Sequence, residues 1–459
     1  MTETIRIPNP IESTGFSKGL IALAAILVIA VAFGGGDSRY GFANLIVQLG
    51  ALLALSFHRQ AFAEFWRAAP FMLRLLVAVS ILVPLLQMVP LPESIWRGLP
   101  GRELVAQSYA LLGESGSAPL SVFPIRTLLA LTALITPLAV LAIGWGCAKR
   151  DLLNVGWICV ALGILNLMIG VPQVLSTDQS ALLYPENLMP GVLFGTFANR
   201  NSTALFLVGA LALAALLPVP GRVRRMEVPA RLILCALLVL AIVLTRSRTG
   251  LVLAIIPVGL FATRFILTQL AQRQGGQQDE RRKGVFALAI AGVGILLIGS
   301  ALALAPGRIA DTIDRFEGSG DDARAYIWED AAYSADRYWP VGSGIGTFDE
   351  VFQIDESLEN LTTRRAGRAH NDYIEIAIEA GLPGIVLVAG WLLLLAWLSW
   401  KARSSEGRWI AWSGSAILFA IALQSLTDYP LRNQTMLAFG AFALVLLLRF
   451  GRSGQEPQT

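Results

Sequence analysis

The sequence predicts an all-α protein that crosses a membrane about twelve times. Of its 459 residues, 55% are hydrophobic and only 15% are charged, whereas soluble domains carry about 25% charged residues. The mean hydropathy is +0.62. A soluble core cannot hold this much apolar surface, so we expect lipid to solvate most of the chain. The net charge of +4 therefore bears on membrane orientation, and nucleic acid is not an expected partner.

The transmembrane helices are predicted from apolar runs. A span needs roughly 20 apolar residues, because the hydrocarbon core is ~30 Å thick and a helix rises 1.5 Å per residue. Such runs lie at residues 19–35, 41–57, 70–90, 126–147, 152–171, 200–218, 230–246, 250–270, 285–305, 381–400, 409–427 and 433–450. The first run also resembles a signal peptide, and we expect it to be retained as a helix. The cysteines Cys147, Cys159 and Cys235 lie in or beside these runs and predict neither a disulfide framework nor a metal site.

The connecting loops predict orientation. Lysine and arginine recur in alternate connections: Arg59 and Arg67; Lys149 and Arg150; Arg222, Arg224 and Arg225; Arg273, Arg281, Arg282 and Lys283; Lys401, Arg403 and Arg408. Basic loops face the cytoplasm, so we expect both termini to be cytoplasmic. The segment 306–380 then forms one large loop on the opposite side, which in a diderm bacterium is the periplasm. The predicted location is the bacterial inner membrane.

Two short polar stretches enter helices on that outer side. Asn199, Arg200 and Asn201 lie at the start of the run at 200–218, where they either face a cavity or cap the helix while Arg200 extends to the interface. Arg246 and Arg248 lie in a tight turn where positive charge is otherwise disfavoured. Their guanidinium groups match phosphate oxygens, in either a bound substrate or lipid head groups.

The large outer loop contains the most conspicuous polar cluster. The loop is acidic overall, yet Arg364, Arg365 and Arg368 stand just before His370. A helix is predicted at 322–336, carrying Arg324, and a flexible glycine-rich turn at 342–346. A further helix at 372–380 ends at a glycine, so His370 is either a site residue or a capping residue at that helix. Glu375 and Glu379 lie one turn apart and are predicted to form a solvated face.

Together these stretches resemble the bacterial O-antigen ligase and polymerase family. The motifs that carry the resemblance occur in order: Gly195-Thr196-Phe197 with Asn199 and Asn201; Ser247-Arg248; Arg324 with Trp328; Pro340-Val341-Gly342 with Gly344 and Gly346-Thr347-Phe348; and His370-Asn371-Asp372-Tyr373 with Gly381-Leu382 and Gly384. The resemblance divides the chain into N-terminal helices (1–190), a family-like core (191–390) and C-terminal helices with a cytoplasmic tail (391–459). The segment 428–432 resembles the family's later outer turn. Members often carry a histidine a few residues before it, where this chain has Gln424.

The resemblance implies a membrane glycosyltransferase with a glycosyltransferase C-like fold. Members transfer a glycan from undecaprenyl diphosphate to a hydroxyl, which belongs to lipid A–core for a ligase and to another lipid-linked glycan for a polymerase. The sequence does not separate these two. Carried over to this chain, His370 is the expected catalytic base and Arg248 the expected diphosphate ligand. The further expected substrate-binding residues are Asn199, Arg200, Asn201, Arg246, Arg324, Arg364, Arg365, Arg368, Asn371 and Asp372. Neither metal nor nucleotide is expected to take part, and no cofactor is predicted.

A transporter or flippase of lipid-linked glycans is the alternative. Transporters usually place charges at mid-membrane and show two-fold hydropathy repeats. In this sequence the apolar runs are almost free of charge, and the polar residues gather on the predicted outer face. The distribution favours a one-sided enzyme.

Overall fold

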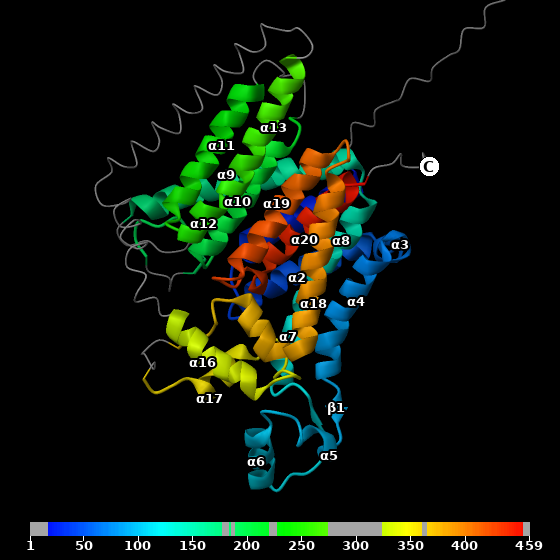
Figure 1. The fold of residues 1–459 in the computed structure, drawn as a ribbon, viewed down its shortest axis with the longest axis vertical. Helices are drawn as coiled ribbons and strands as arrows, with labels where there is room; N and C mark the ends of the chain where they lie inside the picture. Colours follow the sequence, from blue (N-terminus) through cyan, green and yellow to red (C-terminus); the bar gives the residue numbers. More distant parts are fainter. Residues whose placement is uncertain are drawn as a thin grey trace, which may run out of the picture.

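The computed structural model describes residues 17–176, 183–184, 189–219, 227–273, 324–359 and 365–452. Within these ranges the chain is almost entirely helical (Figure 1), which confirms the predicted all-α class. The one sheet in the described ranges is an antiparallel ribbon of β1 (Pro90–Leu91) and β2 (Ala118–Pro119). It lies in the connection between the third and fourth predicted spans.

The helices of the N-terminal half follow the predicted apolar runs, and shorter helices occupy their connections. They are α1 (Lys18–Phe33), α2 (Gly41–Phe57), α3 (Ala61–Ala68), α4 (Phe71–Gln87), α5 (Glu93–Trp96), α6 (Glu103–Leu112), α7 (Pro124–Ala133), α8 (Ile135–Gly146) and α9 (Lys149–Leu175). A one-residue break between α7 and α8 divides the run predicted as one helix.

The C-terminal half agrees with the prediction in the same way. Its helices are α10 (Arg200–Leu216), α11 (Glu227–Leu244), α12 (Arg248–Leu253), α13 (Ile255–Arg273), α16 (Arg324–Arg337), α17 (Phe348–Asp355), α18 (Asp372–Ala402), α19 (Arg408–Gln424), the 3₁₀-helix η2 (Pro430–Arg432) and α20 (Gln434–Phe450). The helix α16 covers the described part of the one predicted at 322–336. The helix predicted at 285–305 lies outside the described residues.

Four helical segments of the described chain are long and apolar enough to cross a membrane: Pro124–Gly146, Lys149–Leu175, Arg248–Thr268 and Asp372–Ala402. The pair α2 and α3 makes a fifth if its 82° bend is counted within one span. Shorter apolar helices, such as α10 and α20, have 17 residues and are about 26 Å long, slightly less than the hydrocarbon thickness. The figure of twelve spans remains a prediction.

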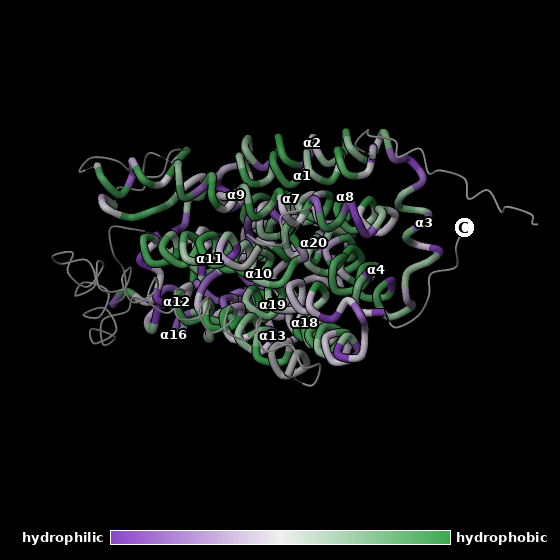
Figure 2. Tube along the Cα trace, turned by 90° about the horizontal axis from the view of Figure 1, so that it is seen from above, coloured by the Kyte–Doolittle hydropathy of each residue, from purple (hydrophilic) through white to green (hydrophobic). Residues whose placement is uncertain are grey.

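The centre of the bundle is formed by α10 and α20. Every residue of α10 from Ser202 to Leu216 is buried, and most of α20 is buried as well. Their contact includes Phe206 and Phe439, whose ring centroids are 5.1 Å apart. A helix that is apolar all round belongs in a protein core or in lipid, and here neighbouring helices bury it. Figure 2, seen along the bundle, shows α10, α19 and α20 enclosed by other largely hydrophobic helices.

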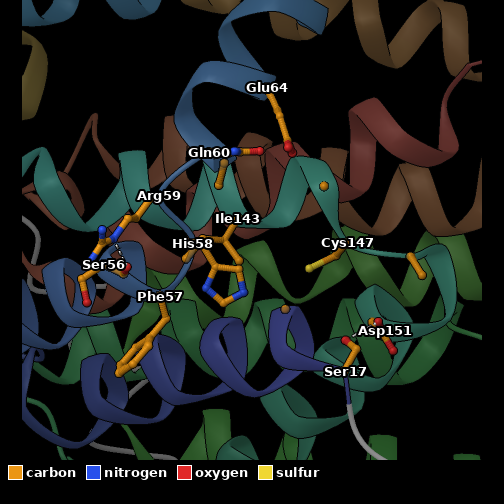
Figure 3. A pocket seen from close by; sticks show the side chains of 14 residues that line it. Ser17, Ser56, Phe57, His58, Arg59, Gln60, Glu64, Ile143, Cys147 and Asp151 are labelled. Carbon is orange, nitrogen blue, oxygen red and sulfur yellow. Dashed lines mark hydrogen bonds between the residues drawn. The ribbon is translucent and has the colours of Figure 1, made fainter. Parts of the chain in front are cut away.

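Several predicted cytoplasmic loops lie together at one end of the bundle. The Arg452 guanidinium lies 4.9 Å from the Trp145 ring centroid, and the Ser405 hydroxyl donates to the Phe450 carbonyl at 2.8 Å. At this end, a 760 Å³ pocket opens between the start of α1, the α2–α3 turn and the α8–α9 turn. Figure 3 shows His58, Glu64 and other side chains around it.

The helix α18 is broken at Gly381, as predicted. Gly381 has φ 56° and ψ −143°, a conformation that favours glycine. The break leaves carbonyl groups free to accept bonds from the turn at 342–346. The Ser343 N–H donates to the Ile378 carbonyl at 2.9 Å, and the Gly344 N–H to the Glu379 carbonyl at 2.8 Å. The turn at 342–346 is thereby attached to the start of α18, the helix that His370 precedes.

Candidate active site

His370 stands immediately before α18 with an unusual backbone. Its φ is 51°, a left-handed conformation that is uncommon for a residue with a side chain. The helix is capped instead by Asn371, whose side-chain oxygen accepts from the N–H groups of Tyr373 and Ile374 at 3.0 and 3.1 Å. Capping therefore does not account for the histidine. Its side chain remains about one-third exposed, at 34%.

The His370 imidazole faces a buried carboxylate. Nδ1 lies 3.5 Å from Oδ1 of Asp428, whose side chain is 2% exposed. Burial tends to raise the pKa of Asp428, but contacts that include the His370 imidazole lower it further than burial raises it. Asp428 is therefore ionised near neutral pH. A carboxylate beside Nδ1 favours the tautomer with the proton on Nδ1 and a free lone pair on Nε2.

The predicted outer turns converge on this pair. The Asn199 side-chain amide donates to both oxygens of Asp428 at 3.2 and 3.1 Å, while its own oxygen caps α10 by accepting from the Asn201 N–H at 2.8 Å. Asn201 in turn accepts from the Ser247 hydroxyl at 2.8 Å. Asn199 thus both caps α10 and faces Asp428, whereas the predicted extension of Arg200 to the membrane interface stays a prediction.

The turn that contains Arg248 lies beside the same group. Ser247 caps α12 by accepting from the Gly250 N–H at 3.1 Å, and Arg248 is the first residue of that helix. The neighbouring hydroxyl of Thr249 lies 3.5 Å from that of Thr427, next to Asp428. Arg246 has φ 52°, and it and Arg248 are half-buried. The sequence motifs at 199–201, 246–249 and 370–371 therefore meet at one place.

Buried polar side chains of α9 hold the first of these turns. The Gln173 side-chain oxygen accepts from the N–H groups of Phe194 and Gly195 at 3.0 and 2.9 Å. Asn166 accepts from the Thr196 N–H at 2.9 Å. A buried backbone N–H without a partner is costly, so these amides fix the path of the chain into α10. The position of Asn199 follows from that path.

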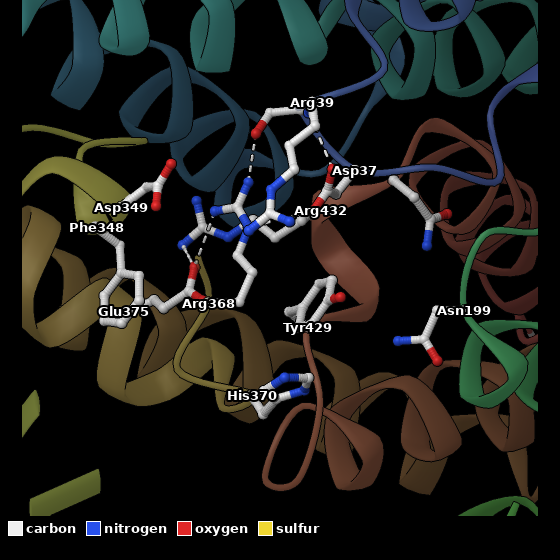
Figure 4. A network of polar contacts seen from close by, with 12 residues as sticks. Asp37, Arg39, Asn199, Phe348, Asp349, Arg368, His370, Glu375, Tyr429 and Arg432 are labelled. Atoms are coloured by element: carbon white, nitrogen blue, oxygen red, sulfur yellow. Dashed lines mark hydrogen bonds and ion pairs between the residues drawn. The ribbon is translucent and has the colours of Figure 1, made fainter. Parts of the chain in front are cut away.

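A second polar cluster lies behind the histidine, around Arg368. This guanidinium is 7% exposed and lies 3.3 Å from Glu375 and 3.8 Å from Asp37. It also donates to the Ser38 hydroxyl and lies 5.9 Å from the Tyr429 ring centroid. Arg368 thereby connects the α1–α2 loop to α18 and to the turn after α19. Figure 4 shows this network beside His370.

Arg432 completes the cluster from η2. It lies 3.5, 3.0 and 2.8 Å from carboxylate oxygens of Asp372, Glu375 and Glu379. These three carboxylates raise the pKa of Arg432 more than burial lowers it. The predicted solvated face is therefore wrong, because the side chains of Glu375 and Glu379 are fully buried. Their partners come from segments that helical spacing alone cannot place near them.

The other predicted site residues lie further from the histidine or have other partners. Arg365 is 52% exposed and pairs with Asp349 of α17 at 2.9 Å. Arg324 begins α16, which reaches the site through Trp328, whose indole N–H donates to the Ala369 carbonyl at 2.8 Å. Asp372 accepts from the Ser425 hydroxyl at 2.9 Å. Arg200 begins α10, and Arg364 lies outside the described residues.

Sequence reasoning assigned no role to four residues of this region. Asp428, Tyr429 and Arg432 lie in the quoted segment 428–432, and their charges in an outer turn were the available signal. Asp37 belongs to the short connection between the first two apolar runs, and no motif marks it. In the described parts of the chain, no three histidine, cysteine, aspartate or glutamate side chains are arranged to hold a metal ion.

The arrangement provides a proton acceptor, arginine side chains and an aromatic ring at one end of an apolar bundle. Residues 233–389 of this chain match the family model described as O-antigen ligase. The matched range contains Arg246, Arg248 and His370. No curated protein matches the chain significantly.

Proposed function

We propose that this chain, whose residues 233–389 match the O-antigen ligase family model, transfers a glycan from undecaprenyl diphosphate to a hydroxyl acceptor. The family assignment itself points to glycan transfer in polysaccharide assembly. The donor, the acceptor class and the residue roles below are our proposal. The acceptor is lipid A–core if the chain is a ligase, or a second lipid-linked glycan if it is a polymerase.

The proposal depends on one observation above all. His370 faces the ionised Asp428, and Asp428 is bonded to Asn199, next to the turn that contains Arg248. These residues come from four segments far apart in sequence. A histidine oriented by a carboxylate is the usual arrangement of a general base. An arginine in a neighbouring turn is the group expected to bind a diphosphate.

The proposed reaction is a single displacement at the anomeric carbon. The acceptor O–H gives its proton to Nε2 of His370 while its oxygen forms the new bond to that carbon. The bond between the anomeric carbon and the diphosphate oxygen breaks, and its electron pair leaves on undecaprenyl diphosphate. Asp428 stabilises the imidazolium that forms. Neither a nucleotide nor a metal ion is required by these steps.

The arginines divide into two proposed roles. Arg248 stabilises the charge that develops on the leaving diphosphate, with Arg246 and Arg200 as further ligands of the donor. Arg368 and Arg432 are engaged by buried carboxylates, so we assign them to positioning the segment before α18. Arg324, Arg364 and Arg365 are assigned to the glycan, which extends away from the membrane.

The proposed setting is the periplasmic face of the bacterial inner membrane, with both termini cytoplasmic. The positive-inside rule supports this orientation, since basic loops such as those of Arg403 and Arg452 lie near one end of the bundle. His370 precedes α18 and Arg403 follows it, so they lie at opposite ends of one candidate span. Membrane lipids and lipid-linked glycans are the expected partners.

Reconstitution of the purified protein tests the function. Vesicles would contain the protein, lipid-linked glycan isolated from the host strain and, in a second series, rough lipopolysaccharide of that strain. We expect a new glycosidic bond to form in one series, together with release of undecaprenyl diphosphate. Movement of intact lipid-linked glycan across the vesicle membrane without a new bond would contradict the proposal and identify a flippase.

A further inference from the structure

A small polar cavity adjoins the His370 cluster. It has a volume of 110 Å³ and lies between the α1–α2 loop, the first turn of α10 and the turn after α19. Its lining includes the polar side chains of Asp37, Arg39, Asn199, Ser202, Tyr429 and Asn433. Tyr429 connects it to the site, because its ring centroid lies 5.1 Å from that of His370. The volume is well below the ~300 Å³ of drug-sized ligand pockets, so it suits part of a larger ligand.

The Arg39 side chain can bind a ligand in this cavity. Among the described residues its guanidinium forms neither a hydrogen bond nor an ion pair, and the side chain is exposed. Its backbone N–H donates to Asp37 at 2.9 Å, which fixes the start of the side chain. Figure 4 shows Arg39 extending toward the cluster that contains Arg368 and Arg432.

The absence of a side chain at Gly367 leaves the space that the Arg39 guanidinium occupies. A Cβ atom on Gly367 would lie 1.6 Å from Nη2 of Arg39, so any larger residue would displace the guanidinium. The three atoms nearest to such a Cβ all belong to the far end of this flexible side chain. The segment that leads to His370 therefore passes directly against Arg39.

The charges around the cavity decide which ligand it suits. The charged side chains that line it are Arg39 and Asp37, and their charges cancel. The lining therefore has no net positive charge to attract a diphosphate, whereas the hydroxyl groups of a sugar can donate to Asp37 and accept from Arg39. Burial also raises the pKa of Tyr429, so its hydroxyl keeps the proton it can donate.

The cavity lies on a different face of α10 from Arg248. Ser202 lines the cavity, while the preceding residue, Asn201, contacts Ser247 beside Arg248. Consecutive helical residues point about 100° apart. The Asn199–Asp428–His370 group therefore has the Arg248 turn on one side and the cavity on the other. A transferase with two substrates needs a donor site and an acceptor site, both next to its catalytic base.

We propose that this cavity binds a sugar of the acceptor, with Arg39 and Asp37 bonding its hydroxyl groups. The inference rests on the proposed function and adds the acceptor subsite to it. Because charge-assisted hydrogen bonds to a guanidinium are strong, loss of Arg39 should raise the acceptor concentration for half-maximal rate roughly ten- to hundredfold. Binding of undecaprenyl diphosphate should not change.

Two variants remove the same interaction in independent ways. Arg39→Ala deletes the guanidinium, and Gly367→Ala displaces it without changing its charge. The matched controls are Arg97→Ala, which removes a partly exposed arginine paired with Glu93, and Gly259→Ala, where an added Cβ meets no atom within 4 Å. Each protein would be purified and tested for monodispersity and melting temperature before assay. The acceptor is then titrated at a fixed concentration of donor isolated from the host strain.

Binding of undecaprenyl diphosphate alone is followed by thermal shift. Weaker acceptor use by both test variants, with unchanged diphosphate binding and normal controls, supports the inference. An unchanged acceptor dependence in Arg39→Ala overturns it. So does weakened diphosphate binding, which would make the cavity part of the donor site. If the wild-type protein itself transfers no glycan, the proposed function is wrong. If the wild type is active and Arg39→Ala has a normal acceptor dependence, only the acceptor subsite is wrong.

Discussion

His370 is constrained in both its backbone and its side chain. Its positive φ turns the residue out of the line of α18, and its ring lies against Asp428 and Tyr429. A left-handed conformation costs a residue with a Cβ about 1–2 kcal/mol, so the surrounding contacts must enforce it. Such strain is concentrated at functional sites. The residue is positioned for more than helix capping.

Replacing His370 tests its role as the base. His370→Ala should abolish or strongly reduce transfer while the protein remains inserted and abundant. His370→Gln retains hydrogen bonding but cannot take up the proton, so its rate should fall roughly 10²- to 10⁴-fold. His58→Gln changes the other histidine, which lines the pocket at the opposite end, and should be neutral. Near-normal turnover of His370→Gln in the purified system would leave the residue only a positioning role.

Replacing Arg248 tests the diphosphate ligand. Arg248→Ala should lower the rate roughly a hundredfold, because one preorganised charge-assisted bond is lost from the transition state. Arg248→Lys should remain defective, since lysine lacks the two-pronged geometry of the guanidinium. Arg59→Lys, at the other end of the bundle, is the matched control. Full activity of Arg248→Ala at normal expression would remove this arginine from the proposed mechanism.

At the scale of elements, α18 and η2 are held together by charge. Successive turns of α18 supply Asp372, Glu375 and Glu379, and η2 supplies Arg432, which contacts all three. A buried ion pair adds little net stability, but removing one partner leaves unpaired buried charges. The cluster therefore acts mainly to fix where η2, and with it Asp428, lies against α18.

Arg432→Met should destabilise the protein by about 3–5 kcal/mol, because three carboxylates lose their shared partner. The measurement is the melting temperature of the detergent-solubilised protein, which should fall clearly. Arg403→Met is the control, since that arginine stacks on Trp400 at the exposed end of α18. A melting temperature equal to the wild type would show that the carboxylates are satisfied without Arg432.

The sequence predicts the elements well and their contacts only in part. Apolar runs locate the helices because length and hydropathy are local properties, and the glycine at 381 marks the break in α18 for the same reason. The motifs indicate His370, Asn199 and Arg248 as candidate residues, and their segments meet in the fold. The partners Asp428 and Arg432 lie about 60 residues beyond α18's start, and no periodicity relates them to it. Helical spacing shows which residues share a face of a helix, but it does not show which segments pack against that face. For this reason Glu379 was predicted to be solvated.

At the scale of the whole molecule, the candidate site and the described basic turns, such as the one that contains Arg403, lie at opposite ends of α18. We expect the His370 end to be periplasmic, and two exposed serines in described loops can test this. Ser115 follows α6 in the connection that leads to α7, and Ser404 lies in the turn after α18. In a cysteine-free background, a membrane-impermeant thiol reagent should label a cysteine at 115, but not one at 404, in cells with a permeabilised outer membrane. The reverse pattern would invert the topology and contradict the proposed function.

The break at Gly381 also bears on how this protein could be recombined with its relatives. The turn at 342–346 bonds to the carbonyls of Ile378 and Glu379, and Gln87 of α4 bonds to both partners, at 2.9 Å to the Ile345 N–H and 2.9 Å to the Glu379 carbonyl. The turn at 342–346 therefore cannot be exchanged independently of α18 and α4. A chimera whose junction falls between this turn and α18 would combine the turn of one parent with the helix of another. The bonds between them would then fit poorly, and the histidine before the helix would be displaced. Exchanges should carry 340–384 as a single block, together with the end of α4.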